Sequence, residues 1–215
     1  MKDKIQLKRI DGSVIFEYED EDNSVKKTVE VYIRKEKASG KENVDLSFAN
    51  LSFTNLIGAD LRNANLSNAD LSFTDLRCDD LSYANLKGAD LRFTDLSYVD
   101  LSNASLINTN LEEADLRGAD LKDAKLSGAN FSDTILNSVK NIKYASCCFM
   151  GNGNKGGQLI AIKINNETML FCGCFKGNEA ELREYIEEDE EKYKASRLIA
   201  LDTVLKLIEI EKVNI

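Results

Sequence analysis

The fold is decided by the sequence VDLSF-ANLSF-TNLIG-ADLRN-ANLSN-ADLSF, which occupies residues 44–73. From Leu46 to Leu136, every fifth position holds a leucine, replaced once by Phe131, at nineteen positions in all. A period of five fits neither a helix, with about 3.6 residues per turn, nor a strand, with two. A backbone that bends once in five residues and completes a four-sided coil in twenty would place all these side chains on one inner axis.

A second period of twenty residues supports four sides in each coil. The string F-T-[N/D]-L begins at Phe53, Phe73 and Phe93, so these three side chains are expected to lie one above another. The A-[D/N]-L-x-x units of residues 44–138 resemble the pentapeptide-repeat family. The resemblance implies a mainly β fold, a right-handed quadrilateral parallel β-helix. It says little about activity, because most members of the family have no known biochemical role.

The segment before the repeats, residues 1–43, is expected to cap the first coil, because an uncovered solenoid end exposes apolar surface and unpaired backbone. A strand is expected after the turn at Asp11. A helix capped by Ser24, or by the residue before it, is expected to end near Gly40. Residues 28–33 are also rich in strand formers, so a strand stays open as the alternative.

The segment after the repeats, residues 139–215, is expected to form a β-hairpin and two helices. The strands are predicted at 159–164 and 168–175, and Asn178 with Glu181 forms a capping box that opens the first helix. The second helix has apolar residues at 3-4-3 spacing, and this face would cover the last coil or pair with its copy in a homodimer. The face consists of Leu198, Leu201, Leu205 and Ile208.

The residue types needed for catalysis are scarce. The chain has no histidine, which removes Ser-His and Cys-His pairs and the commonest metal ligand. Residues 151–156 match the pattern G-x-G-x-x-G, but a strand follows where a dinucleotide site needs a helix. Adjacent CC and CxC pairs lack the usual zinc spacing, and free thiols are expected. We therefore expect no enzyme activity, no metal and no cofactor. The cysteines are Cys78, Cys147, Cys148, Cys172 and Cys174.

The net charge of −9 is concentrated in the repeats, where residues 44–138 hold fifteen acidic and seven basic residues. Such a shaft disfavours direct binding of nucleic acid or anionic membranes, and it suits a basic protein partner. The first residues lack the apolar core of a signal peptide, and no run of eighteen apolar residues could span a membrane. A cytoplasmic location is expected.

Two outward columns, each repeating every twenty residues, are the candidate interaction sites. The aspartate column would form a charged stripe for a partner, unless its members serve to bond their own turns. The phenylalanine column would stiffen the coils by stacking or form an interaction patch. Asp79 interrupts a column of small inner residues, which indicates either a widened corner that admits water or a specialised site. The columns consist of Asp60, Asp80, Asp100 and Asp120, and of Phe53, Phe73 and Phe93.

The sequence leaves three functions open. The first is a non-enzymatic interaction protein whose rigid acidic shaft binds a protein or a small ligand. Its flanking segments look similar to those of small pentapeptide-repeat proteins of bacteria and phages, which implies a role in phage–host conflict, including capture of a signalling nucleotide. The second follows from family members that resemble B-form DNA and bind DNA gyrase. The acidic shaft fits this mimicry, whereas its short length, its phenylalanines and its arginines oppose it. The third, an enzyme that uses a cysteine or a bound metal, has the least support.

Overall fold

The chain forms two compact units in the computed structural model, Met1–Ala129 with Thr134–Asn141, and Asn130–Asp133 with Ile142–Ile215. The N-terminal segment thus belongs to the same unit as most of the repeats. The structure describes residues 2–21, 24–126, 128–140, 143–149, 157–164, 167–172 and 175–187, together with residues 198, 201, 202 and 205.

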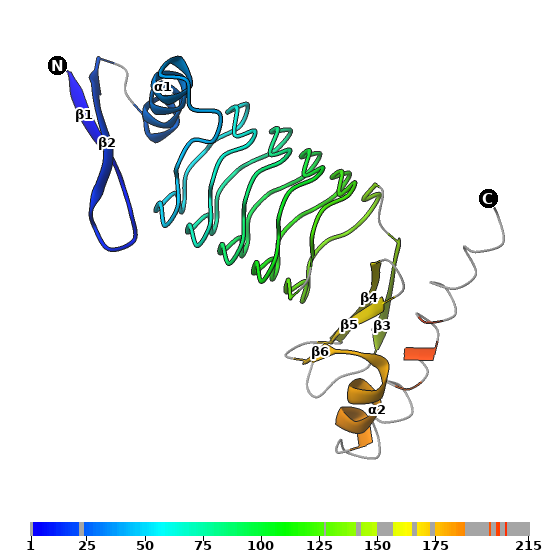
Figure 1. Cartoon of the computed structure of the whole chain (residues 1–215). Coiled ribbons are helices and arrows are strands. Elements are labelled where there is room, and N and C mark those ends of the chain that lie inside the picture. The colour runs from blue at the N-terminus through cyan, green and yellow to red at the C-terminus, as the bar shows by residue number, and fades with distance from the viewer. Residues whose placement is uncertain are drawn as a thin grey trace. The chain divides into compact units, whose positions relative to one another are not determined.

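The repeats form a β-helix whose coils are stacked along one axis (Figure 1). Parallel bridges join residues twenty apart, as in the series Asp60 to Asp80 to Asp100. The Leu51 N–H donates to the Asp70 carbonyl at 2.8 Å, and the Asp70 N–H donates to the Ala49 carbonyl at 2.9 Å. One turn in each five-residue unit gives four turns per coil. The prediction of a four-sided coil of twenty residues is confirmed, and its right-handed sense stays a prediction.

The repeated leucines fill the interior of the coils. Those from Leu46 to Leu126 are at most 3% exposed, and the alanines two residues before them are mostly buried beside them. Where a buried threonine replaces alanine, the hydroxyl bonds the coil before it: Thr74 Oγ1 donates to the Leu51 carbonyl at 2.9 Å, and Thr94 Oγ1 to the Leu71 carbonyl at 2.8 Å. The buried hydroxyls therefore cost little, because each has an acceptor.

The turn between two sides uses a backbone conformation that most side chains avoid. In each unit, the second residue after the leucine has a positive φ, between 53° and 61° for the non-glycine residues and between 68° and 76° for the glycines. Glycine adopts this region freely and asparagine tolerates it, whereas a bulky side chain pays about 1–2 kcal/mol. The Asp or Asn before most of the leucines stabilises the turn, as where Asp70 Oδ1 accepts the Ser72 N–H at 3.0 Å.

An antiparallel hairpin and one helix precede the coils. The strands are β1 (Asp3–Lys8) and β2 (Val14–Asp20), and the helix is α1 (Val25–Ala38). Ser24 caps α1, since its side chain accepts the Lys27 N–H at 3.1 Å. The predicted helix is confirmed and the strand alternative for residues 28–33 is wrong, because the apolar residues of this segment lie on one buried helical face. The buried residues are Thr28, Val29, Tyr32 and Ile33.

This N-terminal segment covers the open end of the first coil. The Lys8 carbonyl accepts the Asn50 N–H at 2.8 Å, and the Phe48 carbonyl accepts the Ile10 N–H at 2.8 Å. The Tyr32 hydroxyl of α1 donates to the Asp45 carbonyl at 3.1 Å. Backbone groups that a further coil would have paired are thus bonded by the cap.

The second unit contains an antiparallel sheet of four strands in the order β3-β4-β5-β6. The predicted hairpin is present as β4 and β5, but β5 ends at Cys172 and not at residue 175, where a separate strand begins. Gly173 interrupts the run of strand formers, which weakens a continuous strand. The strands are β3 (Lys143–Phe149), β4 (Gly157–Ile164), β5 (Glu167–Cys172) and β6 (Phe175–Gly177).

The predicted capping box opens α2 (Glu179–Glu187). The Asn178 N–H donates to Glu181 Oε2 at 2.9 Å, and the Glu181 N–H donates to Asn178 Oδ1 at 3.1 Å. Of the face predicted for a homodimer, Leu198, Leu201 and Leu205 are described, and Leu201 is fully buried; the pairing itself stays a prediction. Most of the rest of the predicted second helix, with Ile208, lies outside the described residues. The same holds for the glycine-rich segment 151–156 and for the side chains of the four cysteines weighed as zinc ligands. Within the described part of the chain, no helix has the length and apolar character needed to cross a membrane.

Candidate functional site

Three phenylalanines form a stack on one outer wall of the shaft, which we call the phenylalanine ladder: Phe53, Phe73 and Phe93. The ring centroids of Phe53 and Phe73 lie 4.7 Å apart with planes 5° from parallel, and those of Phe73 and Phe93 lie 4.6 Å apart with planes at 10°. The side chains are 76%, 48% and 41% exposed in chain order. The structure therefore brings the three predicted residues together on the surface.

The four aspartates of the second column also lie in register, joined by backbone bridges. Each carboxylate accepts the N–H two residues further on, at distances from 2.8 to 3.3 Å. Asp60 also bonds two cations, Arg62 and, at 2.9 Å, Lys37 of α1. These bonds, that of Arg62 above all, hold the pKa of Asp60 far below its usual range. Bonding within the turn thus accounts for the residue type, and the role of Asp80, Asp100 and Asp120 as a charged stripe stays a prediction.

The shaft arginines neutralise part of the negative surface, because each pairs with the aspartate two residues before it. Arg77, for example, bonds both carboxylate oxygens of Asp75, at 2.9 and 2.8 Å, and these bonds lower the pKa of Asp75. The same arrangement occurs at three other places, in the pairs Asp60–Arg62, Asp90–Arg92 and Asp115–Arg117.

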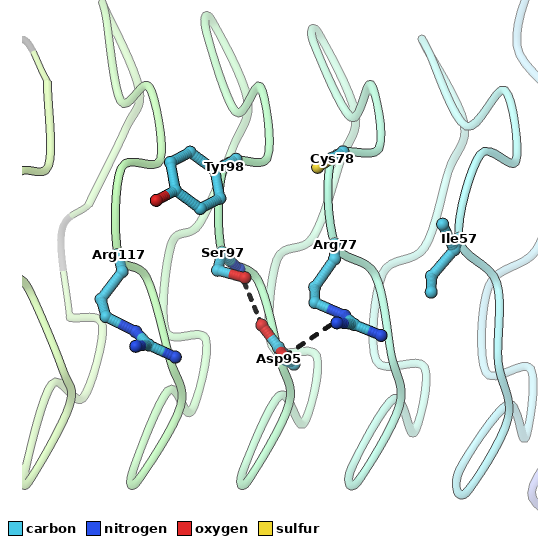
Figure 2. Close-up of a pocket in the computed structure, with 7 residues that line it drawn as sticks. All are labelled: Ile57, Arg77, Cys78, Asp95, Ser97, Tyr98 and Arg117. Atoms are coloured by element: carbon cyan, nitrogen blue, oxygen red, sulfur yellow. Dashed lines mark hydrogen bonds and ion pairs between the residues drawn. The ribbon is translucent and has the colours of Figure 1, made fainter.

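A surface hollow of about 530 Å³ lies on a different wall (Figure 2). Its central residue is Ser97, on the coil between those that carry Arg77 and Arg117. Sequence reasoning missed this hollow, because it treated the arginines as charge alone. The signal was present in the column that contains residues 57, 77, 97 and 117, where one small residue stands between two long ones. The lining residues are Ile57, Arg77, Cys78, Asp95, Ser97, Tyr98 and Arg117.

The ring of Tyr98 lies over Gly118 of the next coil. A Cβ atom at Gly118, where φ is +68°, would meet the ring carbons at 2.7 Å. At the equivalent Gly58, where φ is +76°, an added Cβ would meet only the Lys26 Nζ, at 4.0 Å. Glycine at 118 thus makes room for the aromatic wall of the hollow.

The Gly118→Ala variant is expected to lose roughly 2–3 kcal/mol of unfolding free energy, because it strains the turn and displaces the Tyr98 ring. Gly58→Ala, the matched control, strains only the backbone and should lose about 1 kcal/mol. Urea unfolding followed by circular dichroism measures both values. Equal losses in the two variants would contradict the packing of Tyr98 on Gly118.

Asp79 is a carboxylate inside the shaft, 2% exposed. Its Oδ1 accepts the Gly58 N–H, and among the described residues its Oδ2 has no hydrogen-bond partner. Burial raises the pKa of Asp79 to about 7, against the opposing effects of the Gly58 N–H and of Lys26 on α1. Asp79 is thus a buried carboxyl group inside the shaft, and both the widened corner and the entry of water there stay predictions.

The described residues contain no group of three or more His, Cys, Asp or Glu side chains arranged to hold a metal ion.

Comparisons with known proteins agree with the repeat geometry. A family model described as pentapeptide repeats matches residues 45–77, 80–112 and 100–138, with eight copies. No protein in the curated set matches the chain.

Solved structures of repeat proteins show the same similarity. HetL, a pentapeptide repeat protein involved in heterocyst differentiation regulation in the cyanobacterium Nostoc sp. strain PCC 7120, is 36% identical over 44% of this chain, with a TM-score of 0.28. The match spans only 50% of the length of HetL. The pentapeptide repeat protein alr5209 from Nostoc PCC 7120 is 35% identical over 47% of this chain and 73% of its own, with a TM-score of 0.25. A trypsin-treated form of QnrB1, a plasmid-mediated fluoroquinolone resistance protein, is 24% identical over 44% of this chain and 59% of its own, with a TM-score of 0.28.

Proposed function

Since the chain belongs to the pentapeptide-repeat family, whose members are typically non-catalytic, we propose that it is a non-enzymatic protein that binds a partner protein through the phenylalanine ladder. The observation that carries this proposal is the combination of exposure, stacking and backbone strain at Phe53, Phe73 and Phe93.

Stability alone gives a weak reason for aromatic residues at these turns. Each phenylalanine has φ near 57–58°, a conformation that costs a bulky residue about 1–2 kcal/mol and glycine almost nothing. Stacking returns about 0.5–1.5 kcal/mol per pair. The ladder has three strained residues and only two stacked pairs, so the strain exceeds the gain from stacking, and the ladder also exposes apolar surface. Aligned exposed aromatic residues of this kind are enriched at protein interfaces.

The charge around the ladder favours a basic partner. The column continues beyond Phe93 with Glu113, and the neighbouring position holds Glu112. Asp70 and Asp90, each three residues before a phenylalanine of the ladder, lie in one ladder of backbone bridges, and Arg92 pairs with Asp90. The acidic residues therefore outnumber the one arginine. A partner segment with an apolar patch and adjacent lysine or arginine residues would match this wall, because acidic surroundings attract it and discourage acidic competitors.

The Phe73→Ser variant, which removes the middle ring, is expected to weaken partner binding by about tenfold or more. Tyr83→Ser is the matched control, since Tyr83 is an exposed aromatic residue at the same turn position on another wall, with φ of 61°. Affinity capture with the parent protein identifies the partner, and calorimetry with both purified proteins measures the affinities. Equal binding by the two variants, or an equal loss in both, would refute the ladder as the interface.

The second candidate, mimicry of duplex DNA towards gyrase, is favoured by the register of the aspartate column. The pairing of the shaft arginines with neighbouring aspartates and the uncharged ladder both weaken it. A supercoiling assay with purified gyrase separates the two candidates, because the mimic would inhibit or protect gyrase at micromolar concentration.

The cytoplasmic location, the capture of a small ligand and the link to phage–host conflict remain proposals from the sequence.

A further inference from the structure

The wall that carries the hollow has a regular series of aspartates, and two of the three hold an arginine. Asp75 bonds Arg77 at 2.8 and 2.9 Å, and Asp115 bonds Arg117 Nε through both oxygens, at 2.9 and 2.8 Å. Asp95 lies between them in the same ladder of backbone bridges. Two residues after Asp95 the sequence has Ser97, where the other two coils have arginine.

The carboxylate of Asp95 is bonded less completely than its equivalents. Its Oδ1 accepts the Ser97 N–H at 3.0 Å, and its Oδ2 lies 3.5 Å from Arg77 Nε, at the outer limit of a hydrogen bond. Serine also stands two residues after Asp70, Asp80 and Asp100 on other walls. The hydroxyl donates to Asp70 and to Asp80 at 2.6 Å, whereas Asp100, like Asp95, receives only the backbone N–H of its serine. The Asp95 side chain is 37% exposed, so a group from solution can reach it.

The lining of the hollow is suited to one additional cation. Three charged residues line it, Asp95 and the two arginines. The arginines bond Asp75 and Asp115, which lie outside the lining, so the five groups together carry one negative charge in excess. Because each arginine already has a carboxylate partner, the hollow is less suited to an anion. The Tyr98 ring forms an aromatic wall beside Ser97 (Figure 2), and such a ring attracts cations.

We propose that this hollow binds an arginine side chain of a partner protein, with the guanidinium group on Asp95 and beside Tyr98. The incoming group would occupy the place that Arg77 and Arg117 occupy on the neighbouring coils. A guanidinium fits better than an ammonium, because it is planar, bonds a carboxylate through two parallel N–H groups and stacks on aromatic rings. The site lies on a different wall from the phenylalanine ladder and does not depend on it.

The Ser97→Arg variant tests the proposal, because it supplies the missing arginine from the chain itself and closes the hollow. Ser102→Arg is the matched control: it adds the same residue two positions after Asp100 on another wall and leaves the hollow open. The probe is N-acetylarginine amide, followed by backbone amide shifts of Asp95 and Tyr98 in nuclear magnetic resonance spectra. N-acetyllysine amide and inorganic phosphate serve as comparison ligands.

The parent and Ser102→Arg are expected to show saturable shifts at these amides, with a dissociation constant on the order of millimolar. Ser97→Arg should show none, and Asp95→Asn should bind about tenfold more weakly or worse. Circular dichroism verifies that each variant is folded. Absent shifts in the parent, equal shifts with the lysine probe, shifts with phosphate alone, or equal binding by Ser97→Arg would each overturn the proposal. Phe73→Ser should bind the probe like the parent, because the ladder lies on another wall. The two proposals are therefore tested separately: a result that refutes the arginine site does not refute the ladder interface, and the reverse also holds.

Discussion

Replacing Leu91 with aspartate is expected to unfold the central coils, with a loss of roughly 5 kcal/mol or more in unfolding free energy. Leu91 is fully buried, so the variant loses the burial of an apolar side chain and places a charge where no cation can reach it. Natural domains of this size are stable by about 5–15 kcal/mol, so one such change removes much of the total. Circular dichroism and thermal unfolding of the purified protein measure the effect.

Asn103→Asp serves as the control for the added charge. Asn103 is exposed at a turn, with φ of 59°, and the equivalent position one coil later is already Asp123. This variant should keep the parent stability within about 0.5 kcal/mol. A Leu91→Asp protein that melts like the parent would contradict the common inner axis of the leucines.

Replacing Asp79 with asparagine is expected to stabilise the protein by about 2–4 kcal/mol at pH 8. The pKa of Asp79 is about 7 in the folded protein against 3.8 for the free group, so the folded state binds the proton more tightly than the unfolded state. Stability therefore falls as pH rises from about 4 to about 7 and is constant above that range. Asparagine keeps an oxygen for the Gly58 N–H and carries no charge at any pH.

The gain should shrink on acidification and disappear near pH 4, where Asp79 is protonated in the folded state and largely so in the unfolded state. Urea unfolding of parent and variant at pH 4, 6 and 8 measures this dependence. The control is Asp80→Asn, which neutralises the adjacent surface carboxylate; its Oδ1 accepts the Ser82 N–H at 3.0 Å. Equal pH dependence in the Asp79→Asn variant and the parent would show that Asp79 does not titrate in this way.

The coils could be predicted from sequence because their constraint is local and repeated. Each leucine must face the axis, so the period of five alone fixes the interior, and the period of twenty aligns Phe53 with Phe73. The helix at the N-terminus was predicted from a cap and a one-sided apolar face. Strand β1 was missed, because its sequence DKIQLK is short and polar and becomes a strand by pairing with β2.

The candidate sites were only partly predictable, because the side chains that form them are distant in sequence. The phenylalanine ladder was found, since its members repeat an identical string. The hollow depends on unlike residues twenty apart, such as Arg77, Ser97 and Arg117, and on Gly118, which leaves room for Tyr98. The strained backbone of the ladder was also not foreseen, although glycines at the same turn position, Gly58 and Gly118, indicate a left-handed conformation there.

The hydrogen bonds between residues twenty apart impose two different rules on changes in the length of this protein. An insertion or deletion of five residues keeps the spacing of the leucines, so the interior still closes. The same change moves every later outward residue to the adjacent wall, so the ladder and the hollow lose their alignment. Only insertions or deletions of twenty residues preserve both the leucine spacing and the alignment of the outward residues. The interior therefore accepts many changes in the number of five-residue units, whereas the surface sites accept few.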